Sequence, residues 1–177
     1  MAIFRTNQIA EELLSGYRAQ TGQTLGELTA GHAVLLVFLR HFGCTFCREA
    51  VEEISRKRAT IESGGTLLAF VHLGTEEKAN AFFTPYGLED APRFADPEGR
   101  LYEAFGLVRA ELRQYLNQES ILRMLLAWLN GHFVGLPAGD IQRMPGAFLV
   151  EGREIRKAFR HKLVSDRPDY LALATAT

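Results

Sequence analysis

The feature that most constrains the fold is an unbroken apolar stretch at residues 33–39, which is followed closely by two cysteines. A run of this length, rich in Val, Leu and Phe, predicts a strand that is buried on both faces of a sheet. Beyond Gly43, apolar residues recur at helical spacing and predict a helix over about residues 44–61. Cys44 and Cys47 therefore lie where a central strand passes into a helix.

This position favours redox chemistry. The first backbone N–H groups of a helix are unpaired, and the helix dipole is positive at that end. A thiolate placed there is stabilised, so its pKa falls and it becomes a nucleophile near neutral pH. Arg40 and Arg48 add positive charge nearby in sequence. We take Cys44 and Cys47, one turn apart and able to form a disulfide, as catalytic candidates, with Arg48 and Thr45 in supporting roles.

The composition is that of a soluble globular protein, with 177 residues, 47% hydrophobic and 23% charged. We expect a single domain over residues 1–177, with a helical extension at about 1–30. A net charge of −1 gives no general attraction to nucleic acid or acidic membranes. The apolar runs are too short to cross a bilayer, and the N-terminus lacks the pattern of a signal peptide. We therefore expect a cytoplasmic protein, in which two cysteines favour a redox-active pair.

The order of the remaining segments predicts an α/β fold. A second apolar strand at 66–73 completes a βαβ unit with parallel strands. The later segments predict a helix capped by Thr75, a strand at 92–95, a short helix at 101–105, a β-hairpin with strands at 146–150 and 154–159, and a final helix opened by Asp166. The sum is a mixed central sheet flanked by helices.

Residues 107–137 are predicted to be a helical insertion. The helix expected at 118–130 is apolar nearly all round, so it must be buried, either within the monomer or against a partner. We expect a homodimer that uses part of this surface, including Trp128.

The C-x-x-C pair at the first strand-to-helix junction resembles that of the thioredoxin fold. Pro145 fits the position of that fold's cis-proline, which implies a cis Met144–Pro145 bond lying against the cysteines. Residues 38–50 (FLRHFGCTFCREA), 96–107 and 139–146 resemble the peroxiredoxin-like branch of the alkyl hydroperoxide reductase/thiol-specific antioxidant superfamily, which includes selenoprotein-L-like redox proteins. The resemblance covers roughly residues 30–175.

The same resemblance reveals departures from true peroxiredoxins. Their Pro-x-x-x-Thr-x-x-Cys loop places its proline on Arg40, its threonine on Cys44 and its cysteine on Cys47. Their peroxide-binding arginine falls on Pro145, while the nearby Arg143 is not matched. The resemblance therefore implies thiol–disulfide chemistry more strongly than peroxidase activity.

We expect no metal and no organic cofactor. Structural zinc generally takes four ligands, whereas the sequence holds one C-x-x-C and five scattered histidines. The expected reaction is thiol–disulfide exchange, in which one thiolate attacks a disulfide or hydroperoxide substrate, the other cysteine resolves the intermediate, and a cellular dithiol reduces the pair.

By analogy with thioredoxins, we expect Cys44 to attack the substrate, because it follows Gly43 and can face the helix amides and solvent together. Cys47, within the first helical turn, is expected to be more buried and to resolve. Peroxiredoxin alignment instead assigns the attack to Cys47. Two alternative functions remain: a hydroperoxide-reducing peroxidase that acts through a cysteine sulfenic acid, and a redox-inactive thioredoxin-fold interaction module that docks through residues 118–130.

Overall fold

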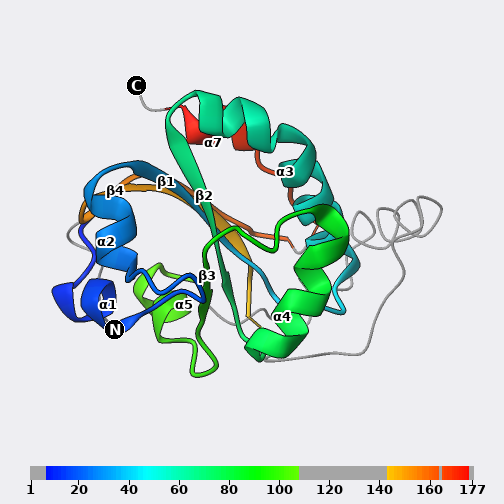
Figure 1. Cartoon of the computed structure of the whole chain (residues 1–177), viewed down its shortest axis with the longest axis horizontal. Helices are drawn as coiled ribbons and strands as arrows, with labels where there is room; N and C mark the ends of the chain where they lie inside the picture. Colours follow the sequence, from blue (N-terminus) through cyan, green and yellow to red (C-terminus); the bar gives the residue numbers. More distant parts are fainter. Residues whose placement is uncertain (1–6, 108–142, 164, 176–177) are drawn as a thin grey trace.

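A mixed sheet of five strands forms the centre of the structure, a computed structural model that describes residues 7–107, 143–163 and 165–175 (Figure 1). The spatial order of the strands is β3-β2-β1-β4-β5, with β1 parallel to β2 and antiparallel to β4. The strands are β1 (Ala33–Phe38), β2 (Thr66–His72), β3 (Arg93–Ala95), β4 (Gly146–Glu151) and β5 (Glu154–Arg160). The prediction of a mixed α/β sheet is confirmed.

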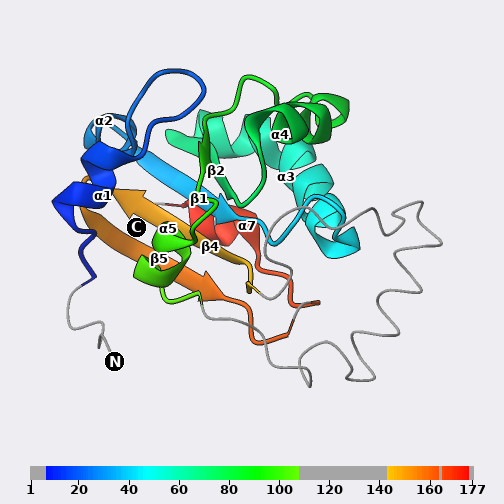
Figure 2. The ribbon, with the colours of Figure 1, turned by 90° about the horizontal axis from the view of Figure 1, so that it is seen from below.

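Helices cover both faces of this sheet (Figures 1 and 2). On one face lie α3 (Thr45–Ser63), α4 (Glu76–Phe83) and α7 (Tyr170–Ala174); on the other lie α1 (Glu11–Gly16), α2 (Leu25–Ala30) and α5 (Arg100–Ala104), and a 3-10 turn (Thr84–Tyr86) follows α4. The insertion expected at 107–137, including the helix at 118–130 and its dimer contact, lies outside the described residues apart from Leu107. Within the described ranges, no helix has the length and apolar character needed to span a membrane.

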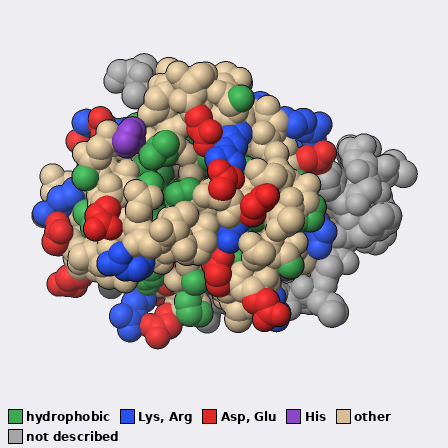
Figure 3. All heavy atoms as spheres, in the orientation of Figure 1, with side chains coloured by type: hydrophobic (Ala, Val, Ile, Leu, Met, Phe, Trp, Pro, Cys, Tyr) green, Lys and Arg blue, Asp and Glu red, His purple; other side chains and the backbone are tan. Residues whose placement is uncertain are grey.

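Alternation along β1 divides the core into two clusters. Leu36 and Phe38 face the cluster built with α1, α2 and α5. Leu35 and Val37 face the cluster built with α3, α4 and α7. Because β1 is buried on both sides, its end is a fixed platform for the segment that follows it. Acidic and basic side chains are interspersed on the face shown in Figure 3, with some hydrophobic side chains between them.

The N-terminal region, for which the sequence predicts a helical extension at about residues 1–30, contains more than one helix. It forms two short helices, and Gly22 has a φ of 93° in the turn between them. A capping box begins α2, because the Thr24 hydroxyl accepts the Glu27 N–H while the Glu27 carboxylate accepts the Thr24 N–H. This local start signal separates α2 from α1.

The final helix begins at Tyr170 rather than at Asp166. The Asp166 carboxylate accepts the backbone N–H groups of Lys162 and Leu163, so it closes a turn instead. Asp169 caps the helix by accepting two N–H groups of its first turn. The intervening Pro168 disfavours the helical conformation in the residue before it.

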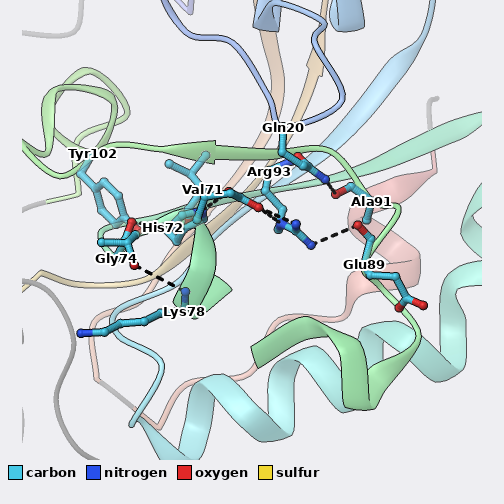
Figure 4. A network of polar contacts seen from close by, with 11 residues as sticks. Gln20, Val71, His72, Gly74, Lys78, Glu89, Ala91, Arg93 and Tyr102 are labelled. Atoms are coloured by element: carbon cyan, nitrogen blue, oxygen red, sulfur yellow. Dashed lines mark hydrogen bonds and ion pairs between the residues drawn. The ribbon is translucent and has the colours of Figure 1, made fainter. Parts of the chain in front are cut away.

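The buried Arg93 fixes the segments beside the end of β1 that leads to the cysteines (Figure 4). Arg93, 2% exposed, donates from Nε to Glu76 Oε1 at 3.0 Å and from Nη1 to the Glu89 carbonyl at 3.1 Å. Gln20 bonds the same strand, donating to the Ala91 carbonyl at 2.8 Å and accepting the Arg93 N–H at 2.7 Å. These bonds hold the start of α4 and the N-terminal region against β3.

The cysteine-bearing loop is wedged against the turn between β2 and α4. The Phe42 ring packs on Phe82 and on the buried His72, with ring centroids 4.9 and 5.4 Å apart. His72 Nδ1 donates to the Gly74 carbonyl at 3.0 Å, which holds that turn in place. A Cβ on Gly74 would lie only 2.5 Å from Phe42 Cε2. The position of the loop therefore depends on the absence of a side chain at Gly74.

We expect Gly74→Ala to destabilise the protein by about 1–3 kcal/mol, because the buried Phe42 ring has to move to accommodate a methyl group. Gly31→Ala is the matched control, since Gly31 has a φ of −108° and open space within 4 Å of the point that a methyl carbon would occupy. Urea denaturation of both variants measures the difference. Equal effects of the two substitutions would contradict this account of the loop.

Candidate active site

The structure places both cysteines at the junction of β1 and α3, as the sequence predicts. Cys44 is the N-cap of α3, with an extended backbone (φ −77°, ψ 120°), and Cys47 lies in the first helical turn. A tight turn leads into the helix, because the Cys44 N–H donates to the His41 carbonyl at 3.0 Å. The first helical bond follows at once, from the Arg48 N–H to the Cys44 carbonyl at 3.1 Å.

Both cysteines are free thiols, and both are buried. Cys44 is 5% exposed and Cys47 3% exposed. The expectation that Cys44 faces solvent is therefore wrong, because Phe42 and Arg40 of the same loop are buried and close over this end of β1. Burial of both sulfurs means that their immediate neighbours, rather than water, set their ionisation.

Arg40 touches both sulfurs. Its backbone N–H donates to Cys47 Sγ at 3.4 Å, and its guanidinium Nη1 donates to Cys44 Sγ at 3.4 Å. The side chain is itself buried, with 6% of the residue exposed. Arg40 directly follows the last residues of the apolar run, so the position of β1 fixes its backbone, and its side chain turns back over the start of α3.

These contacts separate the pKa values of the two thiols. The hydrogen bond between the cysteine side chains is the largest influence, and together with the positive charge of Arg40 it lowers the pKa of Cys44 to about 6, against the opposing effect of burial. The backbone N–H groups of Phe46 and Cys47 act in the same direction. The same hydrogen bond, burial and the charge of Cys44 raise the pKa of Cys47 well above its ordinary value. Near neutral pH, Cys44 is a thiolate and Cys47 a thiol.

The two sulfurs lie in a pocket of about 490 Å³, a volume that includes space open to solvent. Pro145 lines this pocket, as expected. Its peptide bond does not fit the expectation, because all peptide bonds of the described residues, Met144–Pro145 among them, are trans. Pro145 leads directly into β4, where Gly146 pairs with Phe38, so the chain makes no tight turn there that would require the less favourable cis isomer.

The structure brings together only some of the residues that the sequence singles out. Thr45 is buried beside Cys44 as the first residue of α3, and its hydroxyl has no hydrogen-bond partner among the described residues. Arg48 is not part of the pocket lining, and its guanidinium lies 5.9 Å from the centroid of the Phe82 ring. Arg143 is also outside the lining and pairs with Glu103 at 2.8 Å. Among the arginines that the structure describes, Arg40 is the one with hydrogen bonds to the thiols.

Sequence reasoning missed His161, which lines the same pocket. Its ring packs edge-on against Phe159, with centroids 5.1 Å apart, and its Nδ1 is buried without a hydrogen-bond partner in the described part of the chain. Burial, reinforced by the charge of Arg40, lowers the pKa of His161 to about 4, so the imidazole is neutral at pH 7. The sequence shows only a histidine within a basic run, and the contact with the cysteine loop arises from tertiary structure.

The arrangement supplies a nucleophilic thiolate, a second thiol able to attack it after reaction, and a cation beside both. No group of His, Cys, Asp and Glu residues suited to holding a metal ion occurs within residues 7–107, 143–163 and 165–175. The chemistry that these residues can support on their own is nucleophilic attack by sulfur followed by formation of a disulfide.

Comparison with known sequences identifies related proteins. Residues 53–163 match the model of the family described as AhpC/TSA antioxidant enzyme, a stretch that begins within α3, after both cysteines. The prostamide/prostaglandin F synthase of Danio rerio is 32% identical over 154 residues, covering 81% of this chain and 73% of that protein. The chloroplastic thioredoxin-like protein AAED1 of Arabidopsis thaliana is 23% identical over 108 residues, and the match spans 43% of its length.

Comparison with solved structures supports the same fold. Peroxiredoxin Q of Xanthomonas campestris matches with a TM-score of 0.62 and 16% identity, over 90% of each chain. A mutant of Xylella fastidiosa PrxQ matches with a TM-score of 0.65 and 13% identity, over 93% of this chain and 88% of that chain. The family match covers more than half of the 177 residues, and the observed sheet and helices agree with the fold of the matching structures. The chain therefore belongs to the AhpC/TSA antioxidant enzyme family, in its peroxiredoxin-like branch with a thioredoxin-like fold.

Proposed function

We propose that this protein is a thiol–disulfide oxidoreductase that cycles between a Cys44–Cys47 dithiol and the corresponding disulfide. The observation that carries the proposal is the contact at the N-cap of α3, where the Arg40 guanidinium donates to Cys44 Sγ at 3.4 Å. In this arrangement the pKa of Cys44 is lowered and that of Cys47 is raised, which makes one cysteine a thiolate and keeps its neighbour protonated. A nucleophile and a resolving group need this division of roles. Arg48 and Thr45, which the sequence also suggests, act in this proposal only by supporting the first turn of α3.

The first step is attack by the Cys44 thiolate on one sulfur of a substrate disulfide. A new S–S bond forms to Cys44, the substrate S–S bond breaks, and the leaving thiolate takes a proton from solvent. Cys47 then loses its proton and attacks Cys44 Sγ, which releases the second substrate thiol and leaves the Cys44–Cys47 disulfide. A cellular dithiol restores the starting state by the reverse exchange, so the substrate is reduced and the dithiol oxidised.

Ionisation of Cys47 becomes easier as the reaction proceeds. In the reduced protein, the hydrogen bond to Cys44 and the negative charge of that residue both raise the pKa of Cys47. Both influences disappear once Cys44 is part of a neutral mixed disulfide. The Arg40 backbone N–H and the Arg40 charge, which lower the pKa of Cys47, then act without that opposition. Each step of the cycle therefore prepares the next nucleophile.

Reduction of hydroperoxides is the second candidate function, and Arg40 is the observation that favours it. Its guanidinium reaches the Cys44 sulfur at 3.4 Å, where a donor can also bond an oxygen of a peroxide during O–O cleavage. Attack would give a Cys44 sulfenic acid and an alcohol, and Cys47 would then displace water. The Danio rerio relative is named for the synthesis of prostamide and prostaglandin F. In this chain, Phe46, Ala50 and Pro145 give the pocket an apolar wall that can contact the organic part of a hydroperoxide.

A stopped-flow comparison of the reduced protein with a small disulfide, hydrogen peroxide and an organic hydroperoxide separates these two functions. The proposed function predicts the largest rate constant with the disulfide. A rate constant with either peroxide that exceeds the disulfide value by several orders of magnitude would make the protein a peroxidase. Absence of reaction with all three would support a redox-inactive interaction module.

We predict that limited alkylation labels Cys44 before Cys47 at pH 7. Because the pKa of Cys44 is lowered to about 6, Cys44 is almost fully ionised above pH 7 and its alkylation is fastest there. Both the thiolate fraction and the alkylation rate decline as the pH falls through 6. Iodoacetamide labelling from pH 5 to 9, with the modified residue located by mass spectrometry, measures this profile. First labelling at Cys47 would reverse the roles and restore the peroxiredoxin assignment of the nucleophile.

A Cys47→Ser protein should accumulate a mixed disulfide between Cys44 and its substrate, because the resolving thiol is absent. The matched control is Cys44→Ser, which keeps one cysteine in the pocket but lacks the activated thiolate. After incubation with oxidised glutathione, intact-mass measurement should show the adduct on Cys47→Ser and little on Cys44→Ser. Trapping only on Cys44→Ser contradicts the proposed order of attack.

A further inference from the structure

Arg40 contacts the two sulfurs through different groups, and these groups have different consequences. The backbone N–H on Cys47 is held by the chain itself, so any residue other than proline at this position would supply it. The guanidinium on Cys44 depends on the side chain and carries a full positive charge. Substitution of Arg40 can therefore remove the second contact and leave the first in place.

We propose that the Arg40 side chain makes the cysteine pair a stronger oxidant by stabilising the reduced state through the Cys44 thiolate. The proposal rests on the proposed function, because it concerns the Cys44–Cys47 disulfide. In the disulfide both sulfurs are neutral, so the attraction between the guanidinium and a negatively charged Cys44 exists only in the reduced protein. A cation that stabilises only the reduced form shifts the dithiol–disulfide equilibrium towards the dithiol.

Burial strengthens this effect. Arg40 is 6% exposed and Cys44 5% exposed, so water screens their attraction far less than it screens an ion pair on the surface. The other ionisable groups around this pair come from several elements. Among the residues that the structure describes, they include Cys47 and Glu53 of α3, His41 of the loop, His161 after β5, Asp166 and Arg167 before α7, Tyr170 of α7, and Tyr102 of α5, whose pKa the charge of Cys47 influences.

Given these neighbours, the ionisation of Cys44 beside Arg40 determines how the redox equilibrium depends on pH near pH 7. Burial and the charge of Arg40 lower the pKa of both His41 and His161 to about 4, so both imidazoles are neutral there. Arg167 forms ion pairs with the carboxylates of Glu49 and Glu53, which offsets its charge. The pH dependence of the redox equilibrium near neutrality should therefore report the ionisation of Cys44.

The proton balance of the exchange makes the proposal measurable. When Cys44 is a thiolate, the reduced protein reacts with oxidised glutathione and consumes one proton. The products are the protein disulfide and two molecules of reduced glutathione. If Cys44 were protonated, no free proton would be consumed. The equilibrium constant for oxidation of the wild-type protein should therefore fall about tenfold for each pH unit between 6.5 and 8, which corresponds to about 30 mV per unit.

The experiment compares the wild-type protein with Arg40→Met, which keeps the bulk of the side chain and removes the charge. At pH 7 the equilibrium constant for oxidation by glutathione should rise by up to about tenfold in the variant. A pKa of about 6 leaves about nine-tenths of Cys44 ionised in the wild type, and the variant loses the stabilisation that this ionisation gives to the reduced state. The dependence on pH should flatten. Arg40→Lys, which keeps the charge but not the fork-shaped group, should restore part of the wild-type behaviour.

A second measurement and a control variant make the outcome decisive. Absorbance of the thiolate at 240 nm, titrated on the fully reduced proteins, reads the effect of Arg40 on Cys44 without requiring a disulfide. Arg56→Met is the control, because the Arg56 side chain lies on the exposed side of α3, is 70% exposed and pairs with Glu52. If Arg40→Met does not fold, Arg40→Lys and Arg40→Gln carry the comparison.

An unchanged thiolate titration and an unchanged glutathione equilibrium in a folded Arg40→Met protein would overturn the proposal. A changed titration in a protein that forms no Cys44–Cys47 disulfide would overturn the proposed function, and with it the redox role of Arg40. An equal change in Arg56→Met would show that the net charge of the protein, rather than the contact with Cys44, is responsible, and would also contradict the proposal.

Discussion

The hydrogen-bonded contact between Arg40 and the two buried cysteines is the interaction on which the site depends. A thiolate that is largely removed from water is unstable unless fixed donors and a positive charge replace its hydration. Here the Cys47 thiol, the Arg40 guanidinium and the first amides of α3 supply that environment for Cys44. Without them, burial would raise the pKa of Cys44 and leave two inert thiols.

The fold provides this contact by fixing the segments on either side of the loop. On the strand side, β1 is buried on both faces, and the Leu39 carbonyl that follows it accepts the hydroxyl of the fully buried Tyr102. On the helix side, Phe42 is wedged against Gly74, and Arg93 holds the start of α4 nearby. Local helix capping, sheet pairing and aromatic packing thus all act on the few residues that carry the chemistry.

The structural features that could be predicted from the sequence are those set by local patterns of residues. The apolar run at 33–39 predicted its strand to within a residue, and the Thr75 cap began its helix as predicted. Features that depend on tertiary packing were not predictable in this way. The burial of Cys44 is one, because Gly43 before it suggests an open loop; the approach of His161 from the β5 hairpin and the position of Arg48 over Phe82 are others. The trans Met144–Pro145 bond differs from expectation because the position of a proline does not determine its isomer.

The central claim is that Cys44 and Cys47 form a reversible disulfide with each other. Trypsin cleaves after Arg40 and Arg48, so one peptide, residues 41–48, contains both cysteines. After mild oxidation and blocking of free thiols, this peptide should be unalkylated and lighter by two hydrogen atoms than its reduced form. Treatment with a dithiol should then return both cysteines to the alkylatable state. Recovery of the peptide with two blocked free thiols, or with its cysteines linked to other chains, would contradict the account.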